Sequence, residues 1–296
     1  MFHDALIIGG SYAGMAAALQ LARARRRVLV VDAGQRRNRY AAHSHGFLTR
    51  DGEAPGVIAG IAREQLLAYD TVTWIDGTAE AAERVDGGFR VSIGQVGEAR
   101  AQRLILATGL REHLPDVPGL AQRWGRSAFM CPYCDGYELD RAPVAVLATS
   151  ALAMHQALLL PDWGPTTLLL NGAFEPDAEQ ARQLADRGVI IEPAAVTRIE
   201  GKADVVLGDG RVLPFAAVFV ATRIELSSPI GAALGCAMDE WPQGRTLRTD
   251  ALKATTVDGV YACGDAIRAA GSVSLAVADG AMAGMAVHRS LVFPAH

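Results

Sequence analysis

The chain has 296 residues, which suits two domains because a typical domain has roughly 100–200 residues. Half of the residues are hydrophobic and 20% are charged, so we expect sizeable cores and no long disordered stretches. The formal net charge of −4 gives no electrostatic reason to expect nucleic acid or an anionic membrane as a partner.

The N-terminal residues carry no secretory signal, and no apolar run reaches the ~18–20 residues that span a bilayer. We therefore expect a cytoplasmic protein. Residues 5–9 form an apolar strand, residues 12–24 repeat with helical periodicity, and residues 28–32 form a second apolar strand. This β-α-β order is typical of a parallel sheet with helices on its faces. The basic cluster at 23–27 closes the helix, where cations suit the dipole, and we interpret it as a solvated helix end.

The turn between the first strand and the helix reads Gly9-Gly10-Ser11-Tyr12-Ala13-Gly14 and has the pattern of a dinucleotide-binding fingerprint. Gly9 permits the tight turn, and Gly14 allows close packing of the helix on the strand. The small Ser11 stands where glycine normally lets the backbone approach a pyrophosphate. Asp32, at the end of the second strand, can bind a ribose hydroxyl. A purely structural turn is the alternative, but the strand, the helix and the acid together favour a nucleotide site.

Further along the chain, residues 89–93 and part of 203–214 alternate with period two and predict strands. A second β-α-β unit follows the first pattern, with strands at 143–147 and 167–170 and a helix at 151–160. Aligning Ser11 with Ser150 superimposes the two units without a gap and also places Met15 on Met154 and Leu19 on Leu158. We interpret this as an internal duplication of a nucleotide-binding unit.

These elements predict an α/β fold with two dinucleotide-binding, Rossmann-like domains. The first domain is discontinuous over residues 1–113 and 246–296, and the second is inserted at 114–245. Prolines and glycines mark both crossings between them, at 115–119 and at 242–244. The tail at 271–291 predicts a long helix rich in small residues.

The second unit has lost the nucleotide-binding residues of the first. The same ungapped alignment exchanges the key positions as follows: Gly9 for Ala148, Gly10 for Thr149, Gly14 for Ala153 and Asp32 for Asn171. Residues 171–181 contain no arginine for a 2′-phosphate and carry three acids. Together these changes predict that the second domain does not bind NADPH productively.

The inserted domain contains a C-x-x-C pair, Cys131 and Cys134. Such a pair can close a small disulfide, and a thiolate within it is nucleophilic because its pKa is lowered. Zinc is the main competitor, but it needs four ligands, and the sequence has no second C-x-x-C and no His-x3-5-His. We therefore expect redox chemistry and no metal site. The isolated Cys236 and Cys263 are interpreted as buried small hydrophobes.

Residues 104–109 (Leu-Ile-Leu-Ala-Thr-Gly) and 258–265 (Asp-Gly-Val-Tyr-Ala-Cys-Gly-Asp) resemble the second and third flavin-contacting motifs of the two-dinucleotide-binding-domain flavoproteins. With Cys-x-x-Cys-Asp-Gly in the inserted domain, the whole chain resembles the low-molecular-weight thioredoxin reductases. The resemblance implies FAD as the cofactor, bound by the first turn (Gly9, Ser11, Tyr12, Ala13, Gly14), the second strand and following loop (Asp32, Ala33, Arg37, Asn38, His45), the second motif (Ala107, Thr108, Gly109), and the third motif with the next helix (Gly264, Asp265, Ser272, Val273).

The same resemblance implies roles for individual residues. Asp265 lies on the FAD ribitol, and the helix that begins near Ser272 points its N-terminus at the flavin, where its dipole stabilises the anionic reduced form. Cys134 faces the flavin C4a, Cys131 meets the substrate, and Asp135 protonates a leaving thiolate. The alternatives are a helix N-cap for Asp265 and a surface turn acid for Asp135. His43 and His45 lie on a loop that wraps the isoalloxazine in this superfamily, so we expect flavin packing, with a base for thiol chemistry as the alternative.

Flavoproteins of this shape with a degraded NADPH site resemble the dithiol oxidases of the gliotoxin and holomycin oxidase group. The shared features are the turn at 9–14, Arg37-Asn38, residues 43–48 (His-Ser-His-Gly-Phe-Leu), and Cys-Pro-Tyr-Cys followed by Gly-Tyr-Glu. In that group electrons run from a substrate dithiol to the cysteine pair, then to FAD and then to oxygen. That group often has histidine after the second cysteine, whereas this chain has Asp135, as thioredoxin reductases do. The direction of the reaction therefore stays open.

The sequence predicts an FAD-dependent thiol/disulfide oxidoreductase that oxidises a small-molecule dithiol through Cys131 and Cys134, without NADPH, and passes the electrons to oxygen. One alternative is a thioredoxin reductase-like enzyme that reduces a thioredoxin-like protein with electrons from ferredoxin or another donor. A second is a redox-sensing flavoprotein that signals through domain rotation. Relatives of this kind are usually homodimers, so we expect a homodimer.

Overall fold

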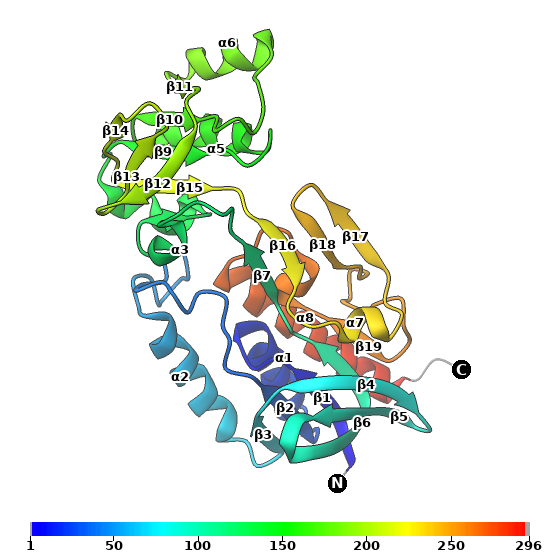
Figure 1. The fold of residues 1–296 in the computed structure, drawn as a ribbon. Coiled ribbons are helices and arrows are strands. Elements are labelled where there is room, and N and C mark those ends of the chain that lie inside the picture. Colours follow the sequence, from blue (N-terminus) through cyan, green and yellow to red (C-terminus); the bar gives the residue numbers. More distant parts are fainter. Residues whose placement is uncertain (1, 294–296) are drawn as a thin grey trace. The chain divides into compact units, whose positions relative to one another are not determined.

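The computed structural model of the chain describes residues 2–293, which divide into two compact units (Figure 1). The first unit holds residues 2–39, 47–111 and 224–293, and the second holds residues 40–46 and 112–223. The first unit is built on a mixed sheet whose central strands are parallel, and the second on a parallel sheet, each with helices packed against it, which confirms the predicted fold class.

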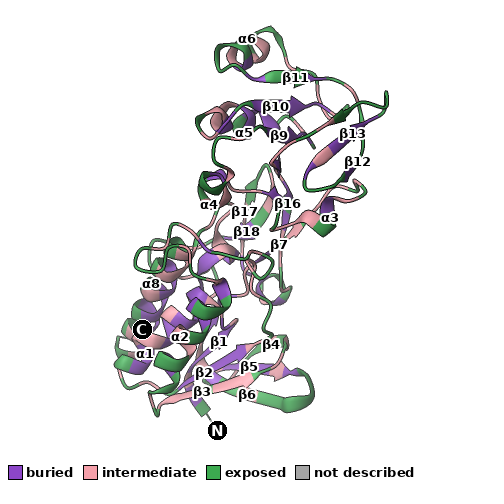
Figure 2. Cartoon of the chain, turned by 90° about the vertical axis from the view of Figure 1, so that its left-hand side faces the viewer, coloured by how far each residue is buried: buried purple, intermediate pink, exposed green. Residues whose placement is uncertain are grey.

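The main sheet of the first unit has the order β3-β2-β1-β6-β5-β4, with β19 paired to β6. Strands β1, β2, β3, β6 and β19 are parallel, and β4 to β6 form antiparallel hairpins. The strands are β1 (Phe2–Ile8), β2 (Val28–Asp32), β3 (Val72–Asp76), β4 (Ala79–Val85), β5 (Gly88–Ile93), β6 (Gly97–Leu106) and β19 (Val260–Ala262). In Figure 2 the central strands β1 and β2 are buried, as expected for apolar runs covered on both faces.

Helices α1 (Tyr12–Arg23), α2 (Pro55–Leu67) and α8 (Val273–Val292) pack in this unit, with the short α7 (Ile230–Ala233) and the 3-10 turns η1 (Gly94–Val96) and η4 (Gly264–Ile267). Helix α8 corresponds to the helix predicted at 271–291. It lies directly against α1. At Gly280 the two helices are so close that an added Cβ would overlap the carbonyl oxygen of Ala13. The small residues of the predicted tail helix therefore let two helix backbones meet.

A second, smaller sheet, most of whose residues belong to the first unit, has the order β17-β18-β16-β7. Its strands are β7 (Leu110–His113), β16 (Arg223–Leu226), β17 (Met238–Trp241) and β18 (Gly244–Leu247). Ile230, Cys236 and Leu247 are buried in the same core as Leu104 and Leu106 of the main sheet. This packing places residues 224–245 in the first unit, whereas the sequence analysis assigned them to the second domain.

The second unit has a parallel sheet of order β11-β10-β9-β15-β8 and a smaller antiparallel sheet of order β12-β13-β14. The strands of the unit are β8 (Ala128–Phe129), β9 (Val144–Leu147), β10 (Thr166–Leu169), β11 (Ile190–Glu192), β12 (Val196–Glu200), β13 (Asp204–Leu207), β14 (Val212–Leu213) and β15 (Ala217–Val220). Its helices and 3-10 turns are α3 (Leu120–Arg123), α4 (Pro132–Asp135), η2 (Tyr137–Leu139), α5 (Ala153–Leu159), η3 (Leu160–Asp162) and α6 (Ala178–Asp186).

The two units repeat one β-α-β order in the register that the sequence indicates. With Ser11 aligned to Ser150, residues 5–8 of β1 fall on β9 (Val144–Leu147), and α1 falls on α5 with η3. Between residues 2 and 293, none of the helices is long and apolar enough to cross a bilayer.

Candidate active site

The turn that follows β1 can be formed only with glycine at two of its positions. Gly9 has φ of +105°, and a Cβ added there would overlap the carbonyl oxygen of Ala107. A Cβ added at Gly14 would overlap the carbonyl oxygen of Gly9. The turn is therefore as tight as the dinucleotide fingerprint requires, and any side chain at Gly14 would push α1 away from the strand.

The first turn of α1 presents unused hydrogen-bond donors. The backbone N–H groups of Tyr12, Ala13 and Gly14 donate to no acceptor within residues 2–293. Two earlier N–H groups of the turn are used, because Gly9 donates to Val31 O at 2.8 Å and Gly10 donates to Asp32 Oδ1 at 3.0 Å. Free N–H groups at the positive end of a twelve-residue helix favour a phosphate group.

Asp32 and a tryptophan that the sequence analysis overlooked flank this turn. A Cβ added at Gly10 would overlap the Trp74 ring and the Asp32 side chain. The Trp74 indole N–H donates to Asp76 Oδ1 at 2.8 Å, and the Arg63 guanidinium lies 4.4 Å from the Trp74 ring centroid. Trp74 thus fixes one side of the turn. Its sequence signal was the apolar run at 72–76 that ends in an acid, as the run at 28–32 does.

The loop after β2 brings together several residues that were predicted to bind the cofactor. Arg37 Nη1 donates to Asp265 Oδ2 at 3.0 Å, and both side chains are less than one-fifth exposed. Asn38 Nδ2 donates to the Tyr12 hydroxyl at 3.3 Å, and that hydroxyl donates to Pro55 O at 3.0 Å. Burial raises the pKa of Tyr12. The buried Asn38 Oδ1 has no hydrogen-bond partner among the described residues, so it is available to a ligand donor.

The second and third motifs pack onto the same turn. Ala107 N–H donates to Ile8 O at 2.9 Å, which sets Ala107, Thr108 and Gly109 at the end of β6. Gly264 has φ of +68°, and a Cβ there would lie 2.7 Å from the Ala13 Cβ. Ser272 caps α8 by accepting from Leu275 N–H at 3.2 Å, and Val273 begins that helix. Ala33 lies exposed directly after Asp32.

FAD fits these residues. The fitting features are a glycine turn that any Cβ would fill, three unused N–H donors, the carboxylates Asp32 and Asp265, and the unpartnered Asn38 Oδ1. In a bound state the donors of α1 would take the pyrophosphate, Asp32 the adenosine ribose and Asp265 the ribitol.

The redox pair predicted from the sequence lies in the second unit, where Cys131 and Cys134 form a disulfide with their Cα atoms 5.4 Å apart. Cys131 occupies the N-cap position of α4, and Cys134 N–H donates to Cys131 O at 3.2 Å. Cys236 and Cys263 are free and buried, and burial raises the pKa of Cys263 to about 12. The isolated cysteines are therefore the inert small residues that the sequence analysis expected.

Three titratable groups accompany the disulfide in the second unit. Burial raises the pKa of Asp135 to about 6, with repulsion from Glu138 adding to the rise and His45 opposing it. His45 Nδ1 lies 3.4 Å from Glu138 Oε1. His45, which was predicted among the cofactor residues, belongs to the compact unit that carries the disulfide. A carboxyl group with a pKa near neutrality suits proton transfer to and from thiols.

Two further residues anchor the redox loop, and no sequence motif marked them. Gln156 on α5 is buried and donates from Nε2 to Met130 O at 2.7 Å, directly before Cys131. The ring of Trp163 meets Tyr133 edge to face, with centroids 5.2 Å apart. Both anchors come from the repeated β-α-β unit, so that unit positions the disulfide.

In the turn after β9, several polar groups make hydrogen bonds within the second unit, whereas the corresponding N–H groups at the start of α1 have no such partner within residues 2–293. Ser150 Oγ accepts from Leu152 N–H at 3.3 Å, and Ser150 O accepts from Ala153 N–H at 3.1 Å. Thr149 Oγ1 donates to Ala221 O at 3.0 Å. Asn171, which replaces Asp32, accepts from Val196 N–H at 2.8 Å through Oδ1. When the two units are aligned, helix α5 also begins two positions later than α1. Two of the three N–H donors that would face a pyrophosphate, and the acceptor for a ribose, are therefore occupied.

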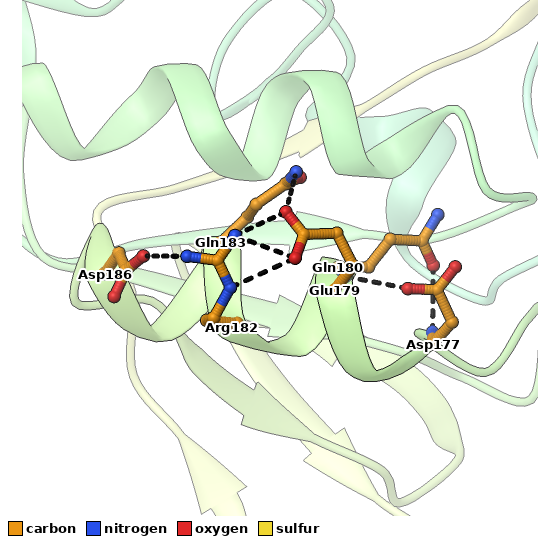
Figure 3. Close-up of polar contacts among 6 residues, drawn as sticks. All are labelled: Asp177, Glu179, Gln180, Arg182, Gln183 and Asp186. Atoms are coloured by element: carbon orange, nitrogen blue, oxygen red, sulfur yellow. Dashed lines mark hydrogen bonds and ion pairs between the residues drawn. The ribbon is translucent and has the colours of Figure 1, made fainter.

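Helix α6 begins within residues 171–181, the stretch in which the sequence analysis found no arginine for a 2′-phosphate, and the arginine of this helix is already paired. Figure 3 shows Arg182 between Glu179 and Asp186, at 2.6 Å from Glu179 Oε1 and 3.4 Å from Asp186 Oδ2. Asp177 and Gln180 form a reciprocal capping box at the start of the helix. Two of the three acids noted at 171–181 thus have structural roles, because Asp177 caps α6 and Glu179 pairs with the only arginine of that helix.

A C-x-x-C disulfide on one Rossmann-like unit, in a chain whose other unit has an open dinucleotide turn, defines a disulfide oxidoreductase. The chain belongs to the pyridine nucleotide-disulphide oxidoreductase family, whose sequence model matches residues 3–280. Enzymes of this family act on sulfur groups and are typically flavin-dependent.

The thioredoxin reductase-like character expected from the sequence is confirmed by similar proteins. The chain is 30% identical to thioredoxin reductase tcpT of Claviceps purpurea, over 98% of this chain and 94% of that protein. It is 29% identical to thioredoxin reductase aclD of Aspergillus oryzae, over 98% and 96%. Among solved structures, an oxidoreductase from Agrobacterium tumefaciens is 52% identical with full coverage of both chains and a TM-score of 0.97. HlmI is 35% identical over 98% of this chain and 92% of its own, with a TM-score of 0.91.

Proposed function

We propose that this protein binds FAD and oxidises a small-molecule dithiol through Cys131 and Cys134, without NADPH, with dioxygen as the final electron acceptor. The observation that carries the proposal is the contrast between the two turns. The α1 turn offers three unused N–H donors, whereas the turn before α5 donates two of the corresponding N–H groups to Ser150. A chain that binds one dinucleotide needs an electron donor other than NADPH, and the dithiol supplies it.

The cysteine pair exchanges two electrons with the substrate. A substrate thiolate attacks Cys131 Sγ, the Cys131–Cys134 bond breaks, and Cys134 leaves as a thiolate. The second substrate thiolate then attacks the substrate sulfur of the mixed disulfide and releases Cys131, so the substrate departs as a disulfide and the enzyme carries two thiols. Bound FAD would accept these two electrons and pass them to dioxygen, which yields hydrogen peroxide.

Asp135 is the proposed proton carrier for this exchange. With a pKa of about 6 its carboxyl group is mostly ionised at neutral pH, so it can accept a proton from an attacking thiol. In its protonated form it can return the proton to a departing thiolate. Glu138 raises the pKa of Asp135, and His45 lowers it.

Oxygen consumption tests the proposal. Purified protein reconstituted with FAD should consume dioxygen and form an equal amount of hydrogen peroxide when it is given dithiothreitol in air. The Cys131→Ser and Cys134→Ser variants bind FAD through the other unit and serve as matched controls that should make no peroxide. Reduced flavin that persists in air in the wild-type protein would refute the oxidase proposal.

A second candidate is a thioredoxin reductase-like enzyme that reduces a protein disulfide with electrons from ferredoxin or another donor. Asp135 in place of histidine favours it, and so does the name thioredoxin reductase carried by tcpT and aclD. Reduction of an added thioredoxin by the FAD-loaded protein and reduced ferredoxin, without peroxide formation, would favour this candidate.

Two further expectations complete the proposal. We propose a homodimer in the cytoplasm, on the resemblance to thioredoxin reductases. Sedimentation equilibrium tests the dimer, and cell fractionation tests the location. A monomer at micromolar concentration, or recovery in a membrane or secreted fraction, would contradict the corresponding part.

A further inference from the structure

A buried carboxylate on α8 binds two cations that come from separate loops of the first unit. Asp279 is only 4% exposed, and Lys253 Nζ lies 2.9 Å from its Oδ1. Arg268 grips the same carboxylate with two nitrogens, through Nη2 at 2.8 Å from Oδ1 and through Nε to Oδ2. Burial alone would raise the pKa of Asp279, but hydrogen bonds from Arg268 and Lys253 hold it below the usual range. The carboxylate is therefore charged and saturated with donors.

Arg268 lies close to Asp265, the acid assigned to the FAD ribitol. It follows the η4 turn, and its backbone N–H donates to Asp265 O at 3.1 Å. The Asp265 carboxylate also stabilises the charge of the Arg268 guanidinium electrostatically, so the two groups attract each other. Asp265 already accepts one hydrogen bond, from Arg37 Nη1 at 3.0 Å.

The two carboxylates therefore compete for one guanidinium. Asp279 binds Arg268 at two nitrogens, whereas Asp265 attracts it from three residues earlier in the chain. The Arg268 side chain is 35% exposed, so part of it faces solvent and is not enclosed by packed protein. Besides Asp279, Asp265 is the carboxylate that attracts the Arg268 guanidinium, so the loss of the Asp279 charge would favour a contact with Asp265. A second arginine on Asp265 would occupy the oxygen that a ribitol hydroxyl needs.

We infer that Asp279 is a positioning residue that holds Arg268 away from Asp265 and so keeps the Asp265 carboxylate available to FAD. The inference rests on the proposed function, because it needs FAD as the cofactor. A simpler role, in which Asp279 only fastens α8 to its neighbours, makes a different prediction for a double variant.

The experiment is a cycle of Asp279→Asn, Arg268→Gln and the double variant, with FAD affinity measured by titration of the apoprotein. Asp279→Asn keeps the size of the side chain and should weaken FAD binding about tenfold or more, as expected for the loss of one charge-assisted hydrogen bond to a ligand. Arg268→Gln should stay within about threefold of the wild type. The double variant should return to that same range, because the competing guanidinium is gone. Lys253→Gln is the matched control, since it removes a cation from the same carboxylate and leaves Arg268 paired.

The rescue distinguishes positioning from a structural role. If the double variant binds FAD as weakly as Asp279→Asn, or if Asp279→Asn binds as tightly as the wild type, the inference is wrong. If Asp279→Asn does not fold, Asp279→Ser and its double variant with Arg268→Gln repeat the cycle with a smaller side chain. Failure of the wild-type protein itself to bind FAD would instead overturn the proposed function and, with it, this inference.

Discussion

The change Asp135→Asn should stabilise the fold and slow the reaction, and both effects can be sized. The pKa of Asp135 rises from 3.8 to about 6 on folding, mainly through burial. A group whose pKa is raised in the folded state favours the fold while it is protonated, and this contribution is lost as the pH rises through the folded value. The ionised carboxylate therefore lowers the free energy of unfolding by about 3 kcal/mol at pH 8. This is an upper value, because the side chain is not fully buried.

Asparagine has nearly the same shape and no charge, so it avoids this cost. The Asp135→Asn variant should gain at most about 3 kcal/mol of unfolding free energy at pH 8, and about half of that gain at pH 5. Urea unfolding of the oxidised protein at the two pH values measures the difference. Peroxide formation from a dithiol should fall about 10²-fold to 10⁴-fold, because a proton carrier is lost. An equal gain at both pH values, or none, would refute the assignment of a raised pKa to this carboxyl group.

Three other changes test separate parts of the account. Gly14→Ala should abolish FAD binding, because the added Cβ overlaps the carbonyl oxygen of Gly9. Equilibrium dialysis measures the FAD bound to the variant, and retained binding would contradict the prediction. Asn171→Ala should lower the free energy of unfolding in urea by about 1–3 kcal/mol, because Asn171 accepts a hydrogen bond from Val196 N–H and has φ of +48°. The rate of dithiol oxidation should not change. A loss of oxidation would show that Asn171 serves the reaction. Burial lowers the pKa of His3, so the folded protein should lose stability as the pH falls below about 6.5. In thermal unfolding, the His3→Phe variant should lose less stability over this pH range than the wild type. An unchanged pH profile would contradict this role of His3.

The local features of both nucleotide turns could be predicted because they depend on neighbours in the sequence. A glycine with positive φ at position 9, the apolar runs of β1 and β2, and the exchange of Asp32 for Asn171 are all visible in the order of residues. The disulfide between Cys131 and Cys134 follows from their spacing as well. These features gave the fold class and the redox pair.

The features that were missed depend on contacts between distant segments. Trp74 reaches the glycine turn only because β3 pairs with β2, and Gln156 reaches the redox loop across the second unit. The return of the chain to the first unit was placed near residue 246 because Pro242-Gln243-Gly244 resembles a crossing. Burial of Ile230 and Cys236 in the core of the first unit, which no local pattern marks, moves that return to residue 224.

The most direct test of the central claim is anaerobic stopped-flow reduction of the flavin, with NADPH, NADH and dithiothreitol compared on the same FAD-loaded protein. We expect rapid bleaching of the flavin absorbance by the dithiol and negligible bleaching by either pyridine nucleotide. Rapid bleaching by NADPH would contradict the proposed function, because the turn before α5 would then bind the dinucleotide that its internal hydrogen bonds should exclude.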